Sequence, residues 1–163
     1  MQNINWRISE YDLAEHIRGL YDRCDLESPD GPVVAVNSHS SDPHYEPNFD
    51  QSAIIRKRSW LLLDLWARKR GDPESVYADI TWTAYLGKDP PTEHQRAFDA
   101  VRTARDRAVE FIHESYKNTG PPQGWEVDRS ARTVLERMGY SEYFTHRLGH
   151  CLGTTVHSNC LLY

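Results

Sequence analysis

Two aspartates occupy strand-like stretches that a polar turn separates. Asp64 interrupts residues 60–66, which are otherwise apolar, and Asp79 lies in residues 76–86, where apolar and polar side chains alternate. A run of apolar residues predicts a buried strand, and alternation predicts a strand with two different faces. A hairpin centred between residues 71 and 72 would place the two carboxylates opposite each other, with Cβ atoms about 5 Å apart.

Two carboxylates that face each other in an apolar sheet repel and are poorly solvated. Either one of them holds a proton, or a cation lies between them. A plainer alternative places Asp64 at a strand end, where backbone amides would satisfy it. The hairpin by itself leaves these alternatives open.

The C-terminal part of the chain is rich in histidine. Residues 143–157 include His146, His150 and His157, three of the eight histidines in the sequence. Imidazole is the commonest metal ligand and carries protons near neutral pH. Gly149 and Gly153 flank His150 and would allow a ligand to approach closely. One histidine alone could be an ordinary loop residue, but three of them together with two buried aspartates favour a functional site.

Local signals predict the elements around the hairpin. A helix is expected from the N-cap Ser9 to about residue 21, followed by a buried strand over residues 32–36. Residues 37–47, which contain His44, are polar and bounded by proline, and we expect an irregular loop there. Loops of this composition often carry function.

Two helices are expected after the hairpin. The first begins with Thr92 as N-cap in a capping box and ends near residue 118, and the second begins at Val127 and stops at Gly139. Apolar spacing predicts the inward-facing residues, which are Phe98, Val101, Ala108, Val109, Ile112 and Tyr116 in the first helix and Ala131, Val134, Leu135 and Met138 in the second.

Length and charge restrict the class of protein. The 163 residues fit a single domain spanning residues 1–163, and the net charge of -5 argues against a nucleic-acid surface. No signal peptide is visible, and no apolar run approaches the roughly 20 residues that cross a membrane. The three cysteines are odd in number and form no metal-type pair, which is typical of reduced thiols, so we expect a cytoplasmic protein with no nucleic-acid or membrane partner.

The order of motifs resembles the pita-bread metallopeptidases. PHYEP, a strand aspartate, YADIT, a long helix and the pattern F-x-H-R-x-G-H-x-x-G-x-x-V-H follow one another here. That family includes creatinase, aminopeptidase P, prolidase and methionine aminopeptidase, and the Xaa-Pro peptidase branch is the most similar. The resemblance implies an α+β fold, a partial pita-bread domain with a curved, mostly antiparallel sheet, outer helices and the last strands missing.

The resemblance also implies roles for individual residues. The family holds two divalent ions (Mn, Co, Fe or Zn) with two aspartates, one histidine and two glutamates, and these oxygen and nitrogen donors suit such ions. The matching positions here are Asp64, Asp79 and His150 as metal ligands, His44 and His157 as catalytic residues beside the scissile bond, and His146 as a substrate-binding residue.

The implied activity is that of a metal-dependent exopeptidase acting on peptides with proline after the first residue. The family's two glutamate ligands follow the last histidine, and this chain ends at Tyr163. We therefore expect an incomplete metal site and little peptidase activity from this chain. The alternative is a non-catalytic module that binds a peptide or a protein.

The same resemblance predicts exposed apolar surface where further strands would pack. Trp60, Leu62 and Leu152 are the candidates, and such an open sheet also allows a homodimer. A metal-free, creatinase-like hydrolase is disfavoured because the aspartates and His150 are retained.

Overall fold

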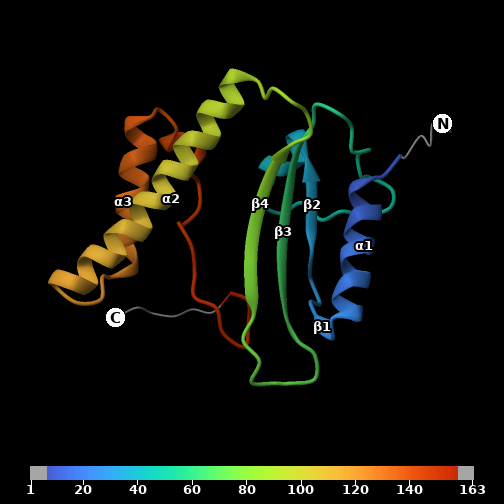
Figure 1. Ribbon diagram of the computed structural model, residues 1–163, viewed down its shortest axis with the longest axis horizontal. Helices are drawn as coiled ribbons and strands as arrows, with labels where there is room; N and C mark the ends of the chain where they lie inside the picture. The colour runs from blue at the N-terminus through green and yellow to red at the C-terminus, as the bar shows by residue number, and fades with distance from the viewer. Residues whose placement is uncertain (1–6, 158–163) are drawn as a thin grey trace. The chain divides into compact units, whose positions relative to one another are not determined.

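The structure is a computed structural model that describes residues 7–157, and it confirms the predicted α+β class (Figure 1). The described chain forms two compact units. One unit comprises the residues up to Asp89 together with the segment from Leu152, and the other comprises Pro90–Cys151. The extent of the predicted single domain stays a prediction.

The first unit is built around an antiparallel sheet. Strand β3 (Trp60–Lys69) pairs along one side with β4 (Ala78–Tyr85), while β1 (Leu26–Glu27) and β2 (Val33–Val36) pair with its other side (Figure 1). The buried strand predicted over residues 32–36 is thereby confirmed. Because β3 has partners on both sides, it is the element that fixes the position of Asp64.

The edge formed by β1 and β2 is interrupted where it passes Trp66. Residues 28–32 lie opposite residues 65–67 of β3, so this edge contains two extra residues. A Cβ atom at Gly31 would lie 2.8 Å from Trp66 Cε2 and 2.8 Å from Ser28 Oγ. The glycine therefore makes room for the indole.

Helix α1 (Glu10–Arg23) covers one face of the sheet. Ser9 is its N-cap, as predicted, and forms a capping box with Asp12. Ala14 and Ile17 pack against the core side chains of β2 and β3, which are Val34, Val36 and Leu61. The core of this unit lies between α1 and this face.

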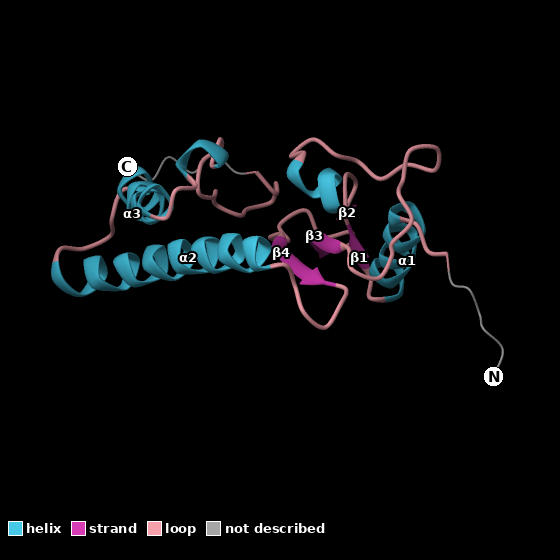
Figure 2. Ribbon diagram, turned by 90° about the horizontal axis from the view of Figure 1, so that it is seen from above, coloured by secondary structure: helices cyan, strands magenta, loops and turns pink. Residues whose placement is uncertain are grey.

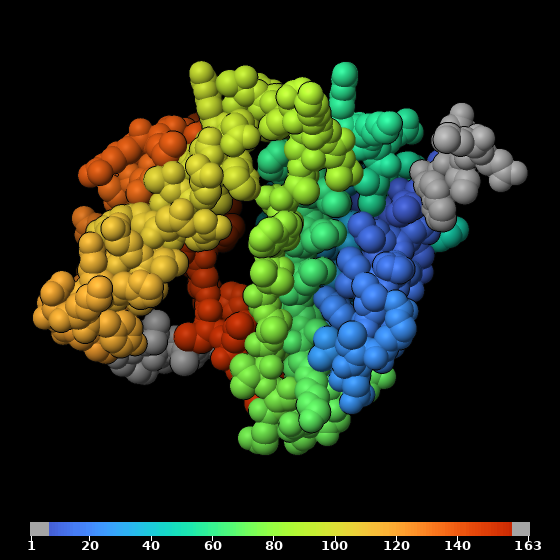
Figure 3. Space-filling view, in the orientation of Figure 1, coloured from blue at the N-terminus to red at the C-terminus, as the bar shows by residue number. Residues whose placement is uncertain are grey.

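The burial predicted for β3 is wrong in part. Only Leu61 is fully buried, while Trp60 and Leu62 are half-buried and so are not the exposed residues predicted above. Leu152 is exposed, as predicted. The residues of β4 that share the α1-covered face are more open, with Ile80 53% and Trp82 65% exposed. Helix α1 covers this face on the side of β2, whereas β4 is at the opposite edge of the sheet (Figures 2 and 3).

The second unit pairs helices α2 (Thr92–Asn118) and α3 (Gly124–Arg137), which run side by side (Figures 1 and 2). The inward face predicted for α2 is confirmed at Ala108 and in part at Ile112, which is half-buried, and is wrong for the other four residues. Ala100, Ala104 and Ala108 are buried against Ala131 and Leu135. Alanines spaced four residues apart form a smooth stripe on which α3 packs closely, and this leaves larger side chains such as Val101 and Tyr116 exposed.

The helix ends differ from the prediction at two points. Thr92 is the first residue of α2 and not its N-cap, because Pro91 occupies that position. Helix α3 begins three residues early, since Gln123 forms a capping box with Glu126. Gly139, with φ of 81°, ends it as predicted. Met138, predicted to face inward, is 43% exposed.

Candidate functional site

The two aspartates lie on adjacent strands and on the same face of the sheet, but they are not directly opposite. Asp64 pairs with Thr81, and Asp79 pairs with Trp66. The predicted register is therefore wrong by two residues. Because side chains two residues apart on a strand share a face, the carboxylates occupy diagonal positions on one surface.

The register differs because β3 continues beyond its predicted end. Arg68 and Lys69 pair with β1, and the Lys69 N–H donates to Ser75 Oγ at 3.0 Å. The turn consequently spans residues 70–77, and the midpoint of the paired residues lies between residues 72 and 73, one residue later than predicted.

Thr81 is a residue of this site that the sequence reasoning missed. Its Oγ1 hydroxyl donates to Asp64 Oδ1 at 2.6 Å, so the half-buried carboxylate has a hydroxyl partner from β4. The plainer alternative is wrong, because Asp64 lies within β3 and no backbone amide of residues 7–157 donates to its carboxylate. The alternation of apolar and polar residues over 76–86 could have indicated it, because this pattern places Thr81 on the same face as Asp79.

The charge of Asp64 also acts on Tyr21 of α1. Burial is the main cause that raises the pKa of the Tyr21 hydroxyl above its ordinary value, and the Asp64 carboxylate raises it further. The hydroxyl has no hydrogen-bond partner among the described residues. A cation bound by Asp64 would oppose this effect.

His44 is exposed at the end of a turn whose first part is more regular than predicted. Residues Asn37–Ser41 form the 3₁₀ helix η1, because the Ser40 and Ser41 hydroxyls donate to carbonyls three residues earlier. The His44 N–H then donates to Asp42 Oδ1 at 2.9 Å. The expectation of an irregular loop is wrong for these five residues.

The segment that carries His157 contacts the hairpin of the first unit. The Tyr77 N–H donates to the Gly153 carbonyl at 3.0 Å, and Arg68 Nη1 donates to the Thr154 carbonyl at 3.1 Å. Arg68 is itself fixed by Glu27 Oε1 at 2.7 Å. This segment therefore belongs structurally with the strands that carry the aspartates.

His146 lies in the second unit, where α3 holds its backbone. Arg132 donates to the carbonyls of Phe144 and His146 at 2.8 and 3.0 Å, and Asp128 Oδ1 accepts the Leu148 N–H at 2.8 Å. Asp128 and Arg132 also pair with each other at 2.9 Å, and this pairing is the main cause that lowers the pKa of Asp128. These hydrogen bonds fix the backbone at His146, while its imidazole ring is exposed.

His150 is also in the second unit, and its Nδ1 lies 3.1 Å from the Cys151 carbonyl oxygen. A proton on Nδ1 that is donated to this carbonyl places the lone pair on Nε2, which is the tautomer that a metal ligand needs. The chemistry of two carboxylates and this imidazole fits a hard or borderline divalent cation. Over residues 7–157, however, no three histidine, cysteine, aspartate or glutamate side chains are gathered closely enough to hold a metal.

The structure thus divides the six predicted site residues between its two units. The first unit contains Asp64, Asp79, His44 and His157, and the second contains His146 and His150. Their predicted roles, and the approach of His150 to the aspartates, stay predictions.

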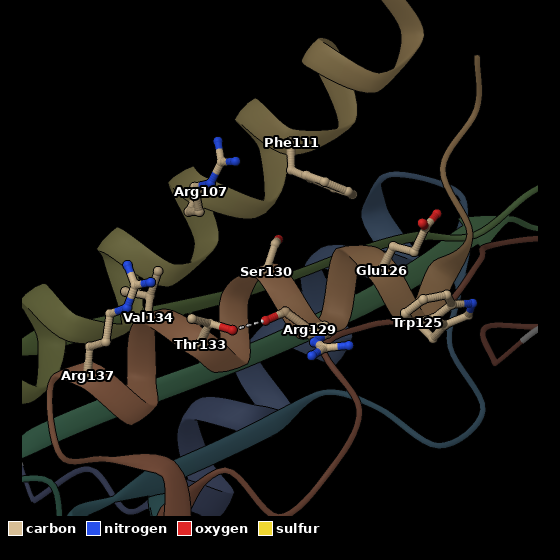
Figure 4. Close-up of a pocket in the computed structure, with 9 residues that line it drawn as sticks. All are labelled: Arg107, Phe111, Trp125, Glu126, Arg129, Ser130, Thr133, Val134 and Arg137. Carbon is tan, nitrogen blue, oxygen red and sulfur yellow. Dashed lines mark hydrogen bonds between the residues drawn. The ribbon is translucent and has the colours of Figure 1, made fainter. Parts of the chain in front are cut away.

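The second unit has a groove of its own between α2 and α3, with a volume of about 460 Å³ (Figure 4). Arg107, Arg129 and Arg137 line it together with Trp125 and other side chains of the two helices. Arg107 is already paired with Glu110 and Glu114. None of the six predicted site residues lines this groove, so it is separate from the candidate site.

No helix within the described residues combines the length and apolar character needed to cross a membrane.

The chain resembles two curated proteins that are named as uncharacterized peptidases. The one from Schizosaccharomyces pombe is 30% identical over 156 residues, covering 95% of this chain and 32% of that protein. The one from Staphylococcus aureus strain USA300 is 28% identical over 151 residues, covering 92% of this chain and 39% of that protein.

Solved structures are similar in fold as well as in sequence. The prolidase from Thermococcus sibiricus is 28% identical with a TM-score of 0.74, over 93% of this chain and 38% of that one. The prolidase from Pyrococcus horikoshii is 26% identical with a TM-score of 0.78, over 96% and 41%. This chain therefore spans about two fifths of the length of these prolidases.

A sequence model of a known family covers almost the whole chain. The model of metallopeptidase family M24 matches residues 1–162. Together with the prolidase structures, this match confirms the predicted pita-bread resemblance. The chain belongs to metallopeptidase family M24.

Proposed function

We propose that this chain provides metal-binding and peptide-orienting residues of an Xaa-Pro peptidase. The observation that carries the proposal is the placement of Asp64 and Asp79 on one face of the β3–β4 hairpin. Residues in diagonal positions of an antiparallel pair lie about 7–8 Å apart. Two carboxylates at this spacing can reach a shared pair of cations, which are about 3.5–4 Å apart in two-metal hydrolases.

Asp64, Asp79 and His150 would hold the divalent ions, and Thr81 would orient the Asp64 carboxylate through its hydroxyl. When bound, such ions polarise a peptide carbonyl and lower the pKa of a bound water. The supporting facts are the same-face register, the Nδ1–carbonyl contact of His150 and the membership of family M24.

The remaining histidines would act on the peptide. His44 and His157 would donate hydrogen bonds beside the scissile bond, and His146 would contact the proline side of the substrate. Each lies on a segment whose backbone is held by hydrogen bonds described above, and each is exposed. The proposed substrate is a peptide with proline after its first residue, as the prolidase relatives suggest.

Metal binding tests the proposal most directly. Free Mn²⁺ is measured by electron paramagnetic resonance during titration of the wild type, Asp64→Asn, Asp79→Asn and the control Asp89→Asn, which removes the same charge from an exposed residue. We expect each of the first two variants to weaken Mn²⁺ binding at least tenfold and the control to stay within twofold. Equal binding by Asp64→Asn and wild type would refute the assignment.

A second measurement separates hydrolysis from binding alone. The wild type is incubated with excess Mn²⁺ and a fluorogenic Xaa-Pro peptide, with Asp64→Asn as the paired variant. Turnover that Asp64→Asn abolishes would assign peptidase activity to this chain. Saturable peptide binding without turnover would assign the non-catalytic binding module.

A further inference from the structure

One buried carboxylate contacts both ends of the loop that carries His44. This loop, residues 37–52, runs from the end of β2 to Ala53. Glu10 of α1 is 0% exposed. Its carboxylate accepts the Val36 N–H at 2.6 Å and the Ala53 N–H at 2.7 Å, and these two residues directly flank the loop.

The same carboxylate contacts the middle of the loop. His39 Nδ1 lies 3.0 Å from each Glu10 oxygen, and the Tyr45 hydroxyl donates to Oε2 at 2.5 Å. The His39 and Tyr45 rings stack with centroids 4.3 Å apart. Burial and then the hydrogen bond to Glu10 raise the pKa of Tyr45 to about 12, so its hydroxyl remains a donor at neutral pH.

A buried carboxylate is stable only where donors surround it. Among the described residues, the hydrogen-bond partners of the Glu10 side chain all come from the loop or from the two residues that flank it. The loop must therefore adopt the path that brings these donors together. Glu10 thereby selects one conformation for a segment that is otherwise polar and exposed.

We propose that Glu10 is the positioning residue for His44. Tyr45, which Glu10 holds, directly follows His44 in the chain. Its N–H donates to the Asp42 carbonyl at 3.1 Å, so the turn around His44 is fixed at its C-terminal side. The His44 imidazole is exposed and has no hydrogen bond of its own within residues 7–157, so the backbone determines where it lies. The inference rests on the proposed function in assigning His44 a role toward the peptide.

The variant Glu10→Gln tests the inference. Glutamine offers one acceptor oxygen and one NH₂ group, so either the Val36 or the Ala53 N–H would face another donor. We expect amide exchange at Val36 and Ala53 to accelerate at least tenfold. We also expect the His44 imidazole resonances to move toward those of a histidine in a flexible peptide.

Asp12→Asn is the matched control, because it removes a charge from the same helical turn, but among the described residues the Asp12 side chain hydrogen-bonds with Ser9 and not with the loop. It should leave the His44 resonances unchanged. Tyr45→Phe is a second variant that keeps the ring and removes one donor, and it decides the question if Glu10→Gln does not fold. We expect it to shift the His44 resonances in the same direction by a smaller amount.

Binding of the dipeptide Ala-Pro provides the functional measurement. Glu10→Gln should weaken binding at least fivefold, and adding His44→Ala to Glu10→Gln should weaken it little further. Unchanged His44 resonances in both the Glu10 and the Tyr45 variants would overturn the inference. If the wild type does not bind Ala-Pro, the proposed function fails, while the resonances of His44 still decide whether Glu10 positions it.

Discussion

Replacing Asp128 by asparagine should destabilise the helical unit by removing the carboxylate that joins α3 to the His146 segment. Asp128 accepts hydrogen bonds from Arg132 Nε and Nη2 and from the Leu148 N–H, at 2.9, 3.1 and 2.8 Å. Asparagine has one oxygen for these three donors, and its NH₂ group would face another donor. The side chains are partly exposed, at 23% for Asp128 and 38% for Arg132.

The size of the effect follows from this partial exposure. Hydrogen bonds to a charged group contribute about 1.5–3 kcal/mol each when buried, and exposed ion pairs contribute about 0–1 kcal/mol. An intermediate loss of about 2 kcal/mol is therefore expected at pH 7. Urea unfolding followed by circular dichroism measures it. Asp99→Asn is the control, since it breaks an exposed pair with Arg102 and should cost less than about 0.5 kcal/mol.

The dependence on pH gives an independent check. Arg132 is the main cause that holds the pKa of Asp128 below its ordinary value of 3.8. A depressed carboxyl pKa stabilises the folded state above the unfolded-state pKa, and this contribution is lost as the pH falls through the folded-state pKa. The difference in the free energy of unfolding between wild type and Asp128→Asn should therefore have its full size above about pH 5 and become smaller below about pH 4. A difference no larger than that of Asp99→Asn, or one that does not shrink in acid, would refute the reasoning.

Three further predictions concern packing. Gly31→Ala should lower the free energy of unfolding in urea by about 1–3 kcal/mol, because its Cβ would meet Trp66. In the control Gly149→Ala the new Cβ would have nothing within 4 Å, and stability should change by less than about 0.5 kcal/mol. Equal effects of the two variants would contradict this. Gly19→Ala in α1 should raise the free energy of unfolding by about 0.5–1 kcal/mol, since its Cβ finds only an ordinary contact at 3.6 Å, and a lower melting temperature would be the contrary result. Trp82→Lys should reduce the fluorescence of a hydrophobic dye and leave the urea midpoint nearly unchanged, and undiminished dye binding would show that this exposed side chain is not the dye site.

The sequence allowed us to predict which residues of the site lie on which strands, but not which of them pair across the hairpin. The alternation of residues 76–86 correctly places Asp79 and Thr81 on one face, because side-chain direction in a strand has a fixed period of two. The register across the turn depends on how far β3 extends, and pairing with β1 determines that. A shift of two residues keeps the face and changes the partner of Asp64.

The sequence by itself determined what is local, such as the capping box at Ser9 and the end of α3 at Gly139, since those signals act within three or four residues. Only the tertiary structure decided that Glu10 is buried. A glutamate in the first turn of a helix is typical of an exposed residue near the positive end of the helix dipole. Its donors come from residues 26 to 43 positions away, and no local pattern records contacts at such separations.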